Sequence, residues 1–392
     1  MTGTATPVAP ADGPPRDRRH FVDPAPFEPE AGGESPIAYA SAWRLILRKF
    51  LRHRMAVASA LILLALYAAA PFVEFLAPYG QARRNGDFLY APPQGVHLFH
   101  EGRFLGPFVY PYSAKLDLDT FRRDYVSDTS RPQPLRFLCR GDGYDWLGLI
   151  RSDLHLVCPP EGGTFFLVGT DRLGRDLHSR MVYGARISLT IGLVGVAISF
   201  ALGLLFGGIA GYFGGLVDAG VQRLIEVVRS LPELPLWLAL SAALPPNWSP
   251  LLVFFGITVI LGLLDWPGLA RAVRGKLLAL REEDFVQAAE LMGATPSRVI
   301  GRHLIPNFMS HLIASATLSI PTMILGETAL SFLGLGLRPP VTSWGVLLNE
   351  AQNLAAVQLY PWLLLPVVPV LITVLAFNFM GDGLRDAADP YH

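Results

Sequence analysis

The segment Glu282–Asn307 reads EEDFVQAAELMGATPSRVIGRHLIPN and lies between two long apolar stretches. Its side chains Phe285, Ala289 and Met292 are spaced i, i+4, i+7, which predicts one face of a short helix. Gly293 follows, and glycine most readily adopts the left-handed conformation that ends a helix. The segment therefore predicts a polar elbow between two membrane spans.

A second helix is expected after the elbow. Thr295 followed by Pro296 is typical of an N-cap with proline at the first helical position. Pro306 predicts the end of this helix, because proline disfavours the helical conformation in the residue before it. A helix, a glycine elbow and a second helix suit docking into a groove on another protein. The small Ala288 and Ala289 would let such a partner approach closely.

The same residues carry a family resemblance. Gln287-Ala288-Ala289, then Gly293, then Ile305-Pro306 resembles the EAA loop of the membrane subunits of ATP-binding-cassette importers. The flanking Asp284-Phe285-Val286 and Arg302-His303-Leu304 are similar to the C-type subunits of the dipeptide/oligopeptide/nickel permease branch. Gln287 stands where that family usually has glutamate. The alternative is an ordinary helix-turn-helix between two spans.

This resemblance implies a surface that couples the chain to an ATPase. Its expected residues are Asp284, Phe285, Gln287, Ala288, Ala289, Met292, Gly293 and Pro306.

The composition indicates a membrane protein. Apolar residues make up 51% of the chain and charged residues only 16%, whereas soluble domains are about a quarter charged. The formal net charge is zero, which gives no support to a nucleic-acid partner. The sequence has no zinc-type cysteine spacing, HExxH motif or GxxxxGK[ST] loop. We therefore expect no catalytic residue, cofactor or metal in this chain, with ATP and Mg²⁺ bound by separate ATPase subunits.

The N-terminal part predicts a tail, a surface helix and a first span. Residues 1–37 are rich in Pro, Ala, Gly and charge, which predicts a disordered cytoplasmic tail. Residues 38–77 combine a basic amphipathic helix (38–54) with a first span, Met55–Val73. The cationic cluster before this span places the N-terminus inside.

Residues 78–183 are expected outside, as a small periplasmic insert of short strands and loops. Cys139 and Cys158 both lie here. An oxidising periplasm permits a disulfide between them, and two unpaired thiols are the alternative. The insert ends in GTDRLGRDLHSRMVYGARISL, from Gly169 to Leu189, which resembles the GTDxxGRD segment that precedes the second span in the same branch. Structural capping and ion pairing are favoured for its Asp171, Arg175 and Asp176 over contact with substrate.

Residues 184–392 predict a core of five further spans. They are Ile187–Val217, Val221–Leu244 with a kink near Pro232 and Pro235, Leu251–Arg271, Phe308–Leu333 and Tyr360–Met380. Trp344–Gln358 is expected as an outer loop or a re-entrant helix.

Two features of this core have functional interest. Small residues repeat every four positions along the second span, which predicts close helix packing within the bundle or against a partner permease. The repeat consists of Gly195, Ser199, Gly203, Gly207, Gly211 and Gly215. Glu327 lies inside the fifth span, where an ionisable group is costly. It either lines a substrate pathway or makes an interhelical hydrogen bond.

The predicted fold is an all-α polytopic membrane protein with six transmembrane helices, similar to type I ATP-binding-cassette importers. The resemblance implies a permease subunit of an ATP-driven, binding-protein-dependent importer in the bacterial inner membrane, with both termini cytoplasmic. Its implied mechanism is alternating access, and peptide is the substrate expected by analogy. Its implied partners are ATPase subunits, a second homologous permease and a periplasmic substrate-binding protein, besides the lipid bilayer.

Two other classes of membrane protein are the alternatives. A membrane-anchored receptor is expected to carry a cytoplasmic output domain after Met380, where only a few residues follow. A secondary transporter would use intramembrane carboxylates, for which Glu327 and Asp265, near the predicted inner end of its span, are the candidates. No inverted internal repeat accompanies them.

Overall fold

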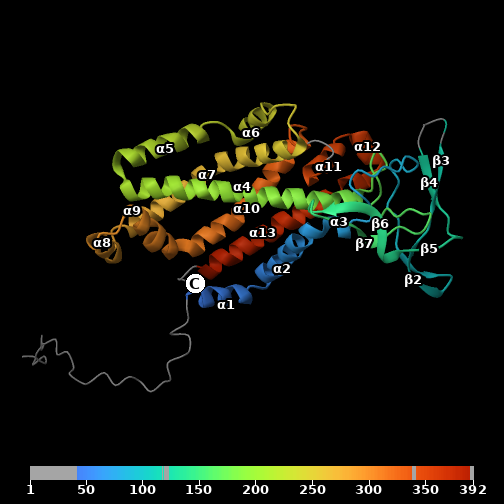
Figure 1. Ribbon diagram of the computed structural model, residues 1–392, viewed down its shortest axis with the longest axis horizontal. Helices are drawn as coiled ribbons and strands as arrows, with labels where there is room; N and C mark the ends of the chain where they lie inside the picture. Colours follow the sequence, from blue (N-terminus) through green and yellow to red (C-terminus); the bar gives the residue numbers. More distant parts are fainter. Residues whose placement is uncertain (1–41, 117, 119–122, 338–340, 389–392) are drawn as a thin grey trace, which may run out of the picture. The chain divides into compact units, whose positions relative to one another are not determined.

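The computed structural model describes residues 42–116, 118, 123–337 and 341–388. The predicted tail, 1–37, lies outside these residues. The described part is mainly helical, with strands confined to one segment (Figure 1). The α-helices are α1 (Ala42–Arg52), α2 (Arg54–Ala69), α3 (Val73–Leu76), α4 (Leu177–Phe213), α5 (Gly215–Arg229), α6 (Glu233–Ala242), α7 (Pro250–Leu280), α8 (Asp284–Leu291), α9 (Pro296–Arg298), α10 (Met309–Phe332), α11 (Trp344–Glu350), α12 (Leu354–Leu359) and α13 (Val367–Ala388). Shorter turns are η1 (Ala70–Phe72), η2 (Val299–Leu304), η3 (Ile305–Phe308) and η4 (Pro361–Leu364).

Five helical stretches among the described residues are long and apolar enough to cross a membrane. They are Arg54–Leu76, Leu177–Phe213, Pro250–Leu280, Pro296–Phe332 and Pro361–Ala388. 

The expected third span, Val221–Leu244, is not one helix. It is divided into α5 and the short apolar α6, with Pro232 in an extended conformation between them. Proline pushes the residue before it away from the helical region, so the predicted kink is a complete break. Helix α6 has 10 residues and is about 15 Å long, half of a bilayer's hydrocarbon core of about 30 Å.

Helix α4 begins at Leu177, inside the segment predicted as part of the insert, and packs along α7 (Figure 1). A Cβ atom at Gly207 would lie 2.5 Å from the carbonyl oxygen of Ala270, and one at Gly211 would lie 2.7 Å from Cβ of Leu277. Only glycine leaves room for so close an approach. The repeat from Gly195 to Gly211 thus packs within the bundle, one of the two predicted alternatives, whereas Gly215 lies beyond the end of α4.

The main apolar core joins α2, α4, α7, α10 and α13. Its buried members include Leu63, Leu189, Ile257, Ile324 and Phe377, one from each of these helices. Because side chains from distant parts of the chain share this core, the five helices pack together as one bundle.

All strands of the described part lie between α3 and α4. They are β1 (His97–His100), β2 (Arg103–Val109), β3 (Tyr112–Leu116), β4 (Arg123–Ser127), β5 (Gln133–Pro134), β6 (Arg136–Trp146) and β7 (Ile150–Cys158). They form three antiparallel groups, ordered β1-β2-β5, β3-β4 and β6-β7. 

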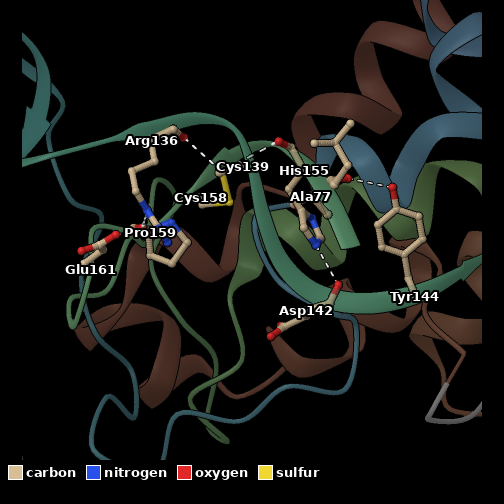
Figure 2. Close-up of a disulfide and its surroundings, with 10 residues drawn as sticks. Ala77, Arg136, Cys139, Asp142, Tyr144, His155, Cys158, Pro159 and Glu161 are labelled. Carbon is tan, nitrogen blue, oxygen red and sulfur yellow. Dashed lines mark hydrogen bonds and ion pairs between the residues drawn. A yellow bond between two sulfur atoms is a disulfide. The ribbon is translucent and has the colours of Figure 1, made fainter. Parts of the chain in front are cut away.

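The β6–β7 hairpin is closed at its base by a disulfide between Cys139 and Cys158, whose Cα atoms are 6.2 Å apart (Figure 2). The ring of buried His155 lies between two carbonyl oxygens, with Nδ1 2.7 Å from that of Ala77 and Nε2 2.9 Å from that of Asp142 (Figure 2). Because Ala77 directly follows α3, the hairpin is tied to the end of the first span.

Candidate functional site

The predicted elbow begins with α8, which follows α7 after a three-residue turn. Val286 of α8 is buried in a core cluster that includes Leu277 of α7 and Val299 of the second limb, and Ala289 is buried as well. The predicted short helix is present as α8, but the residues of the predicted stripe differ in burial: Ala289 is buried, whereas Phe285 and Met292 are exposed. Val286 and Ala289 are spaced i, i+3. This spacing places two residues on one helix face, as does the i, i+4 spacing of the prediction. Ala289 is consequently not available to a partner's backbone.

The turn at Gly293 is present and has a defined hydrogen-bond pattern. Gly293 has φ of +81°. Its N–H donates to the carbonyl oxygen of Glu290 at 2.8 Å, and the N–H of Ala294 donates to that of Ala289 at 3.0 Å. This pair of bonds is a Schellman motif, in which a left-handed residue closes the helix. The elbow is thus locked by backbone geometry that favours glycine.

The second limb does not end at Pro306, contrary to the prediction. Helix α9 continues through the π-helical turn η2 and the 3-10 turn η3 into α10, so that Pro296–Phe332 is one helical stretch. Pro306 lies in the first positions of η3. There the change of winding between η2 and η3 accommodates its ring.

The outward face of α8 and the elbow is both acidic and apolar. Phe285 is 41% exposed, Leu291 90% and Met292 82%. The other exposed residues of this face are Glu282, Glu283, Asp284, Gln287, Ala288, Glu290 and Gly293. Leu291 was missed by sequence reasoning, although an apolar residue beside a helix-ending glycine was the available signal. We name the three apolar side chains the loop ridge.

The loop is attached to the end of α4 by few polar contacts. The hydroxyl of Tyr212 donates to Oε1 of Glu290 at 2.7 Å, and Nη1 of Arg281 donates to the carbonyl oxygen of Tyr212 at 3.4 Å. Arg274 of α7 donates from Nε and Nη2 to the two carboxylate oxygens of Asp218 on α5. An apolar groove of about 590 Å³ lies between α4 and the second limb, lined in part by Phe213 and Ile300.

A second charged group is built on the segment before α4. Nε of Arg175 and Nη1 of Arg180 lie 2.7 Å and 2.5 Å from Oδ2 of Asp171. The same two guanidinium groups contact Oε1 of Glu350 on α11, at 2.9 Å and 3.0 Å. Asp171 is fully buried and Arg180 is 1% exposed. We name these four residues the ionic cluster; its two positive and two negative charges cancel.

The predicted ion-pair role of Asp171 and Arg175 is therefore confirmed. Arg180 binds Asp171 and Glu350. The sequence alone would equally suggest a pair with Asp176, which is four residues before Arg180, as Asp171 is four residues before Arg175. Glu350 is 170 residues away in sequence from Arg180, and no local sequence pattern predicts this contact.

Asp176 has the capping role expected of it. It is the N-cap of α4 and accepts hydrogen bonds from the N–H of Ser179 at 2.8 Å and from its hydroxyl at 2.6 Å. Burial raises the pKa of Asp176 to about 7, since desolvation of the carboxylate outweighs these hydrogen bonds.

The two intramembrane carboxylates have hydrogen-bond partners. Fully buried Glu327 accepts from the hydroxyls of Ser331 and Ser343 at 2.6 Å each, and Ser343 is the N-cap of α11. This geometry is the one expected of the hydrogen-bond alternative. Asp265 accepts from Ser199 at 3.1 Å and lies midway along α7, because that helix runs to Leu280 and does not end at Arg271. Across the described residues, no group of three or more His, Cys, Asp and Glu side chains is placed to hold a metal ion.

Comparison with known proteins identifies the family. Residues 203–391, which contain the whole loop, match the family model described as "Binding-protein-dependent transport system inner membrane component". The dipeptide transport system permease protein DppC of Bacillus subtilis is 40% identical over 234 residues, which cover 59% of this chain and 70% of that one. The chain belongs to this family of inner membrane components. It is accordingly an integral membrane permease.

Two further sequence matches agree with this membership. Residues 41–93 of this permease match the model for the N-terminal TM domain of oligopeptide transport permease C. The oligopeptide transport system permease protein OppC of Haemophilus influenzae is 42% identical over 231 residues, covering 59% of this chain and 71% of that one. Among solved structures, a chain of the MetNI methionine ABC transporter matches with a TM-score of 0.41 and 20% identity, over 54% of this chain and 97% of that one. Neither family model covers residues 94–202, which contain the strands.

Proposed function

We propose that this permease is the transmembrane subunit of an ATP-driven importer of peptides, and that its loop Glu282–Asn307 couples it to an ATPase subunit. The observation that carries the proposal is the loop ridge. Apolar side chains stand exposed on a short helix whose opposite face is buried and whose end is locked by the Gly293 turn. An exposed apolar ridge with an acidic surround fits a partner groove that is apolar within and basic at its rim.

The loop is built to transmit movement. Its second limb is continuous with α10, and α10 is joined to α11 through the hydrogen bonds of Glu327. Helix α11 in turn carries Glu350, which belongs to the ionic cluster. A displacement of the loop would therefore reach the other end of the bundle through packed helices and hydrogen bonds, the kind of connection that couples distant sites.

The mechanism we propose is alternating access. A pair of ATPase subunits, which bind the ATP and Mg²⁺, would move this loop and that of a second homologous permease. A periplasmic binding protein would deliver substrate. Shifting a gate from mostly closed to mostly open takes about 5.5 kcal/mol of differential binding. In this arrangement α5 and α6 together form the third of six spans, both termini are cytoplasmic, and the strand-bearing insert is periplasmic. Peptide is supported by the names of the matched permeases.

The coupling role is tested by placing a charge on the loop ridge. Met292→Asp should reduce both substrate uptake and the amount of ATPase that copurifies with the permease, because a carboxylate would enter an apolar groove. Val126→Asp is the matched control, since Val126 is also an exposed apolar residue but lies on β4. Equal copurification of ATPase with both variants would contradict the proposal.

The elbow offers a second test. Gly293→Pro should abolish uptake and leave membrane insertion intact, because proline cannot adopt the φ of +81° found there. Ala289→Asp should do the same by forcing a carboxylate into the buried face of α8. Normal uptake by either variant would count decisively against the assignment.

The substrate class is tested separately. The purified importer, supplied with its binding protein, should show ATPase activity that is stimulated by short peptides. Stimulation by nickel, a sugar or an opine, with none by peptides, would overturn the peptide assignment and leave the coupling role standing.

A further inference from the structure

The tip of the β6–β7 hairpin is unusually apolar. Trp146 and Ile150 face each other across the last pair of the ladder, and Leu147, Gly148 and Leu149 form the loop between them. Leu147 is 50% exposed, Leu149 85% and Ile150 56%. Isolated hairpin tips in water normally carry polar residues and glycine, so this tip has the wrong side chains for a solvated turn.

The backbone of the tip adds an independent sign. Leu147 has φ of +50° and Gly148 has φ of +71°. Asparagine and glycine tolerate this left-handed region, whereas a bulky aliphatic residue is a genuine outlier in it. A leucine held there costs stability, and such strain is found at places where function requires a particular side chain.

The tip lies against the C-terminal end of the first span. Nε1 of Trp146 donates to the carbonyl oxygen of Pro71 at 2.7 Å, and its ring stacks on Phe72 with 5.6 Å between centroids. Pro71 is about 26 Å along the helix from Arg54 at 1.5 Å per residue, close to the edge of a hydrocarbon core of about 30 Å. The ion pair of Glu74 and Arg186 lies near the same end of the span.

Lipid is the occupant that fits this placement. Phe72 is itself exposed on the span, so the apolar surface of the tip continues directly onto a helix face that must meet acyl chains. Trp146, with an apolar ring and one N–H donor, is the residue type that gathers at membrane interfaces. The base of the hairpin is fixed by the disulfide and by the hydrogen bond between His155 and Ala77 (Figure 2).

We propose that the hairpin tip Trp146–Ile150 inserts into the lipid bilayer beside the end of the first span, with Leu147, Leu149 and Ile150 among the upper acyl chains. The inference rests on the proposed function insofar as Arg54–Leu76 crosses the membrane. It assigns a lipid-binding role to part of the insert, which would keep the insert at a constant height above the bilayer.

Depth-dependent fluorescence quenching tests this insertion. Both native cysteines are bonded to each other, so Leu149→Cys can be labelled with the fluorophore NBD under non-reducing conditions. The full permease in its purified complex is reconstituted in phosphatidylcholine nanodiscs that contain lipid with a doxyl quencher at carbon 5 or carbon 12. We expect strong quenching at position 149, greater with the shallow quencher than with the deep one.

Two further labelled variants set the scale. Leu64→Cys, exposed on α2 within the span, is the positive control. Val126→Cys is the negative control, since β4 lies farther from α2 than β6 and β7 do (Figure 1). Quenching at 149 should be comparable to that at 64 and several-fold stronger than that at 126.

Each other outcome overturns the inference in a recognisable way. Strong quenching at 64 with none at 149 would remove the lipid contact while the span stands. A blue shift at 149 that needs added binding protein, without quenching by lipid, would make the tip a protein-docking surface. Absence of quenching at both 64 and 149 would overturn the span itself, and the proposed function with it.

Discussion

The loop Glu282–Asn307 and the ionic cluster are both rich in charged side chains, but those of the cluster are largely buried and paired whereas those of the loop are exposed. In the cluster, Asp171 and Arg180 are buried and each charge is neutralised within 3.0 Å. In the loop, Glu282, Glu283 and Asp284 are exposed beside an exposed apolar ridge. Burying charge is costly unless every group is paired, so the cluster fixes one geometry. Exposed charge costs little and leaves the loop surface available to a partner.

The largest effect is expected from opening the cluster. Arg180→Met would leave Asp171 and Glu350 with one guanidinium fewer, and Asp171 is fully buried. Breaking a buried pair in this way should lower the free energy of unfolding by about 3–5 kcal/mol. Chemical denaturation in detergent micelles measures it. Glu290→Gln in the loop removes only an exposed charge and keeps an acceptor for the hydroxyl of Tyr212, so this matched control should cost less than about 1 kcal/mol.

The contrast can be sharpened with a charge-balanced variant. Arg180→Met combined with Glu350→Gln removes one charge of each sign, and should cost less than the sum of the two single changes because the residues are in contact. Strict additivity, or equal losses for Arg180→Met and Glu290→Gln, would show that the cluster does not hold this end of the bundle.

A somewhat smaller loss is expected in the insert. Cys158→Ser would open a disulfide whose cysteines are 19 residues apart, and should destabilise the insert by about 3 kcal/mol. ATPase association through the loop should be unchanged. Limited proteolysis with and without a reductant checks this, since reductant should sensitise the native insert and leave the variant unaffected. Equal resistance of native and variant chains would contradict it.

A moderate effect is expected from pH at Asp176. The unfolded chain releases this proton near the ordinary pKa of 3.8, whereas burial raises the pKa of Asp176 to about 7 in the folded state. The folded state therefore binds the proton more tightly, and the stability present below pH 4 is lost as the pH rises to about 7. Asp176→Asn keeps an acceptor for the cap of α4 but cannot titrate. The difference in melting temperature between the two chains, followed from pH 4 to pH 8, should change with pH; parallel curves would contradict the shift.

The smallest effect on stability is expected at the loop ridge. Leu291→Ala and Met292→Ala remove side chains that are 90% and 82% exposed, and each should change the free energy of unfolding by no more than about 0.5 kcal/mol. ATPase copurification should nevertheless fall. Val286→Ala, on the buried face of the same helix, is the control and should lose clearly more stability. A large loss for Met292→Ala would mean that the ridge packs within this chain.

Local signals in the sequence predicted much of this molecule. Apolar runs long enough to cross a bilayer identified the positions of most spans, and the glycine at 293 identified the turn. Asp176 before α4 identified a helix cap. These features depend on a few neighbouring residues, whose conformational preferences and hydrophobicity act within one or two turns of chain.

Tertiary packing decided the rest. Periodicity did not distinguish Val286 from Phe285 as the inward residue of α8, because the neighbouring limb and α7 select that face. Pro306 was tolerated by a change of helical winding, and the partners of Arg180 included a residue 170 positions away. Burial and pairing energies act between segments that only the folded bundle brings together, so a sequence pattern records which contacts are possible and the packed structure selects among them.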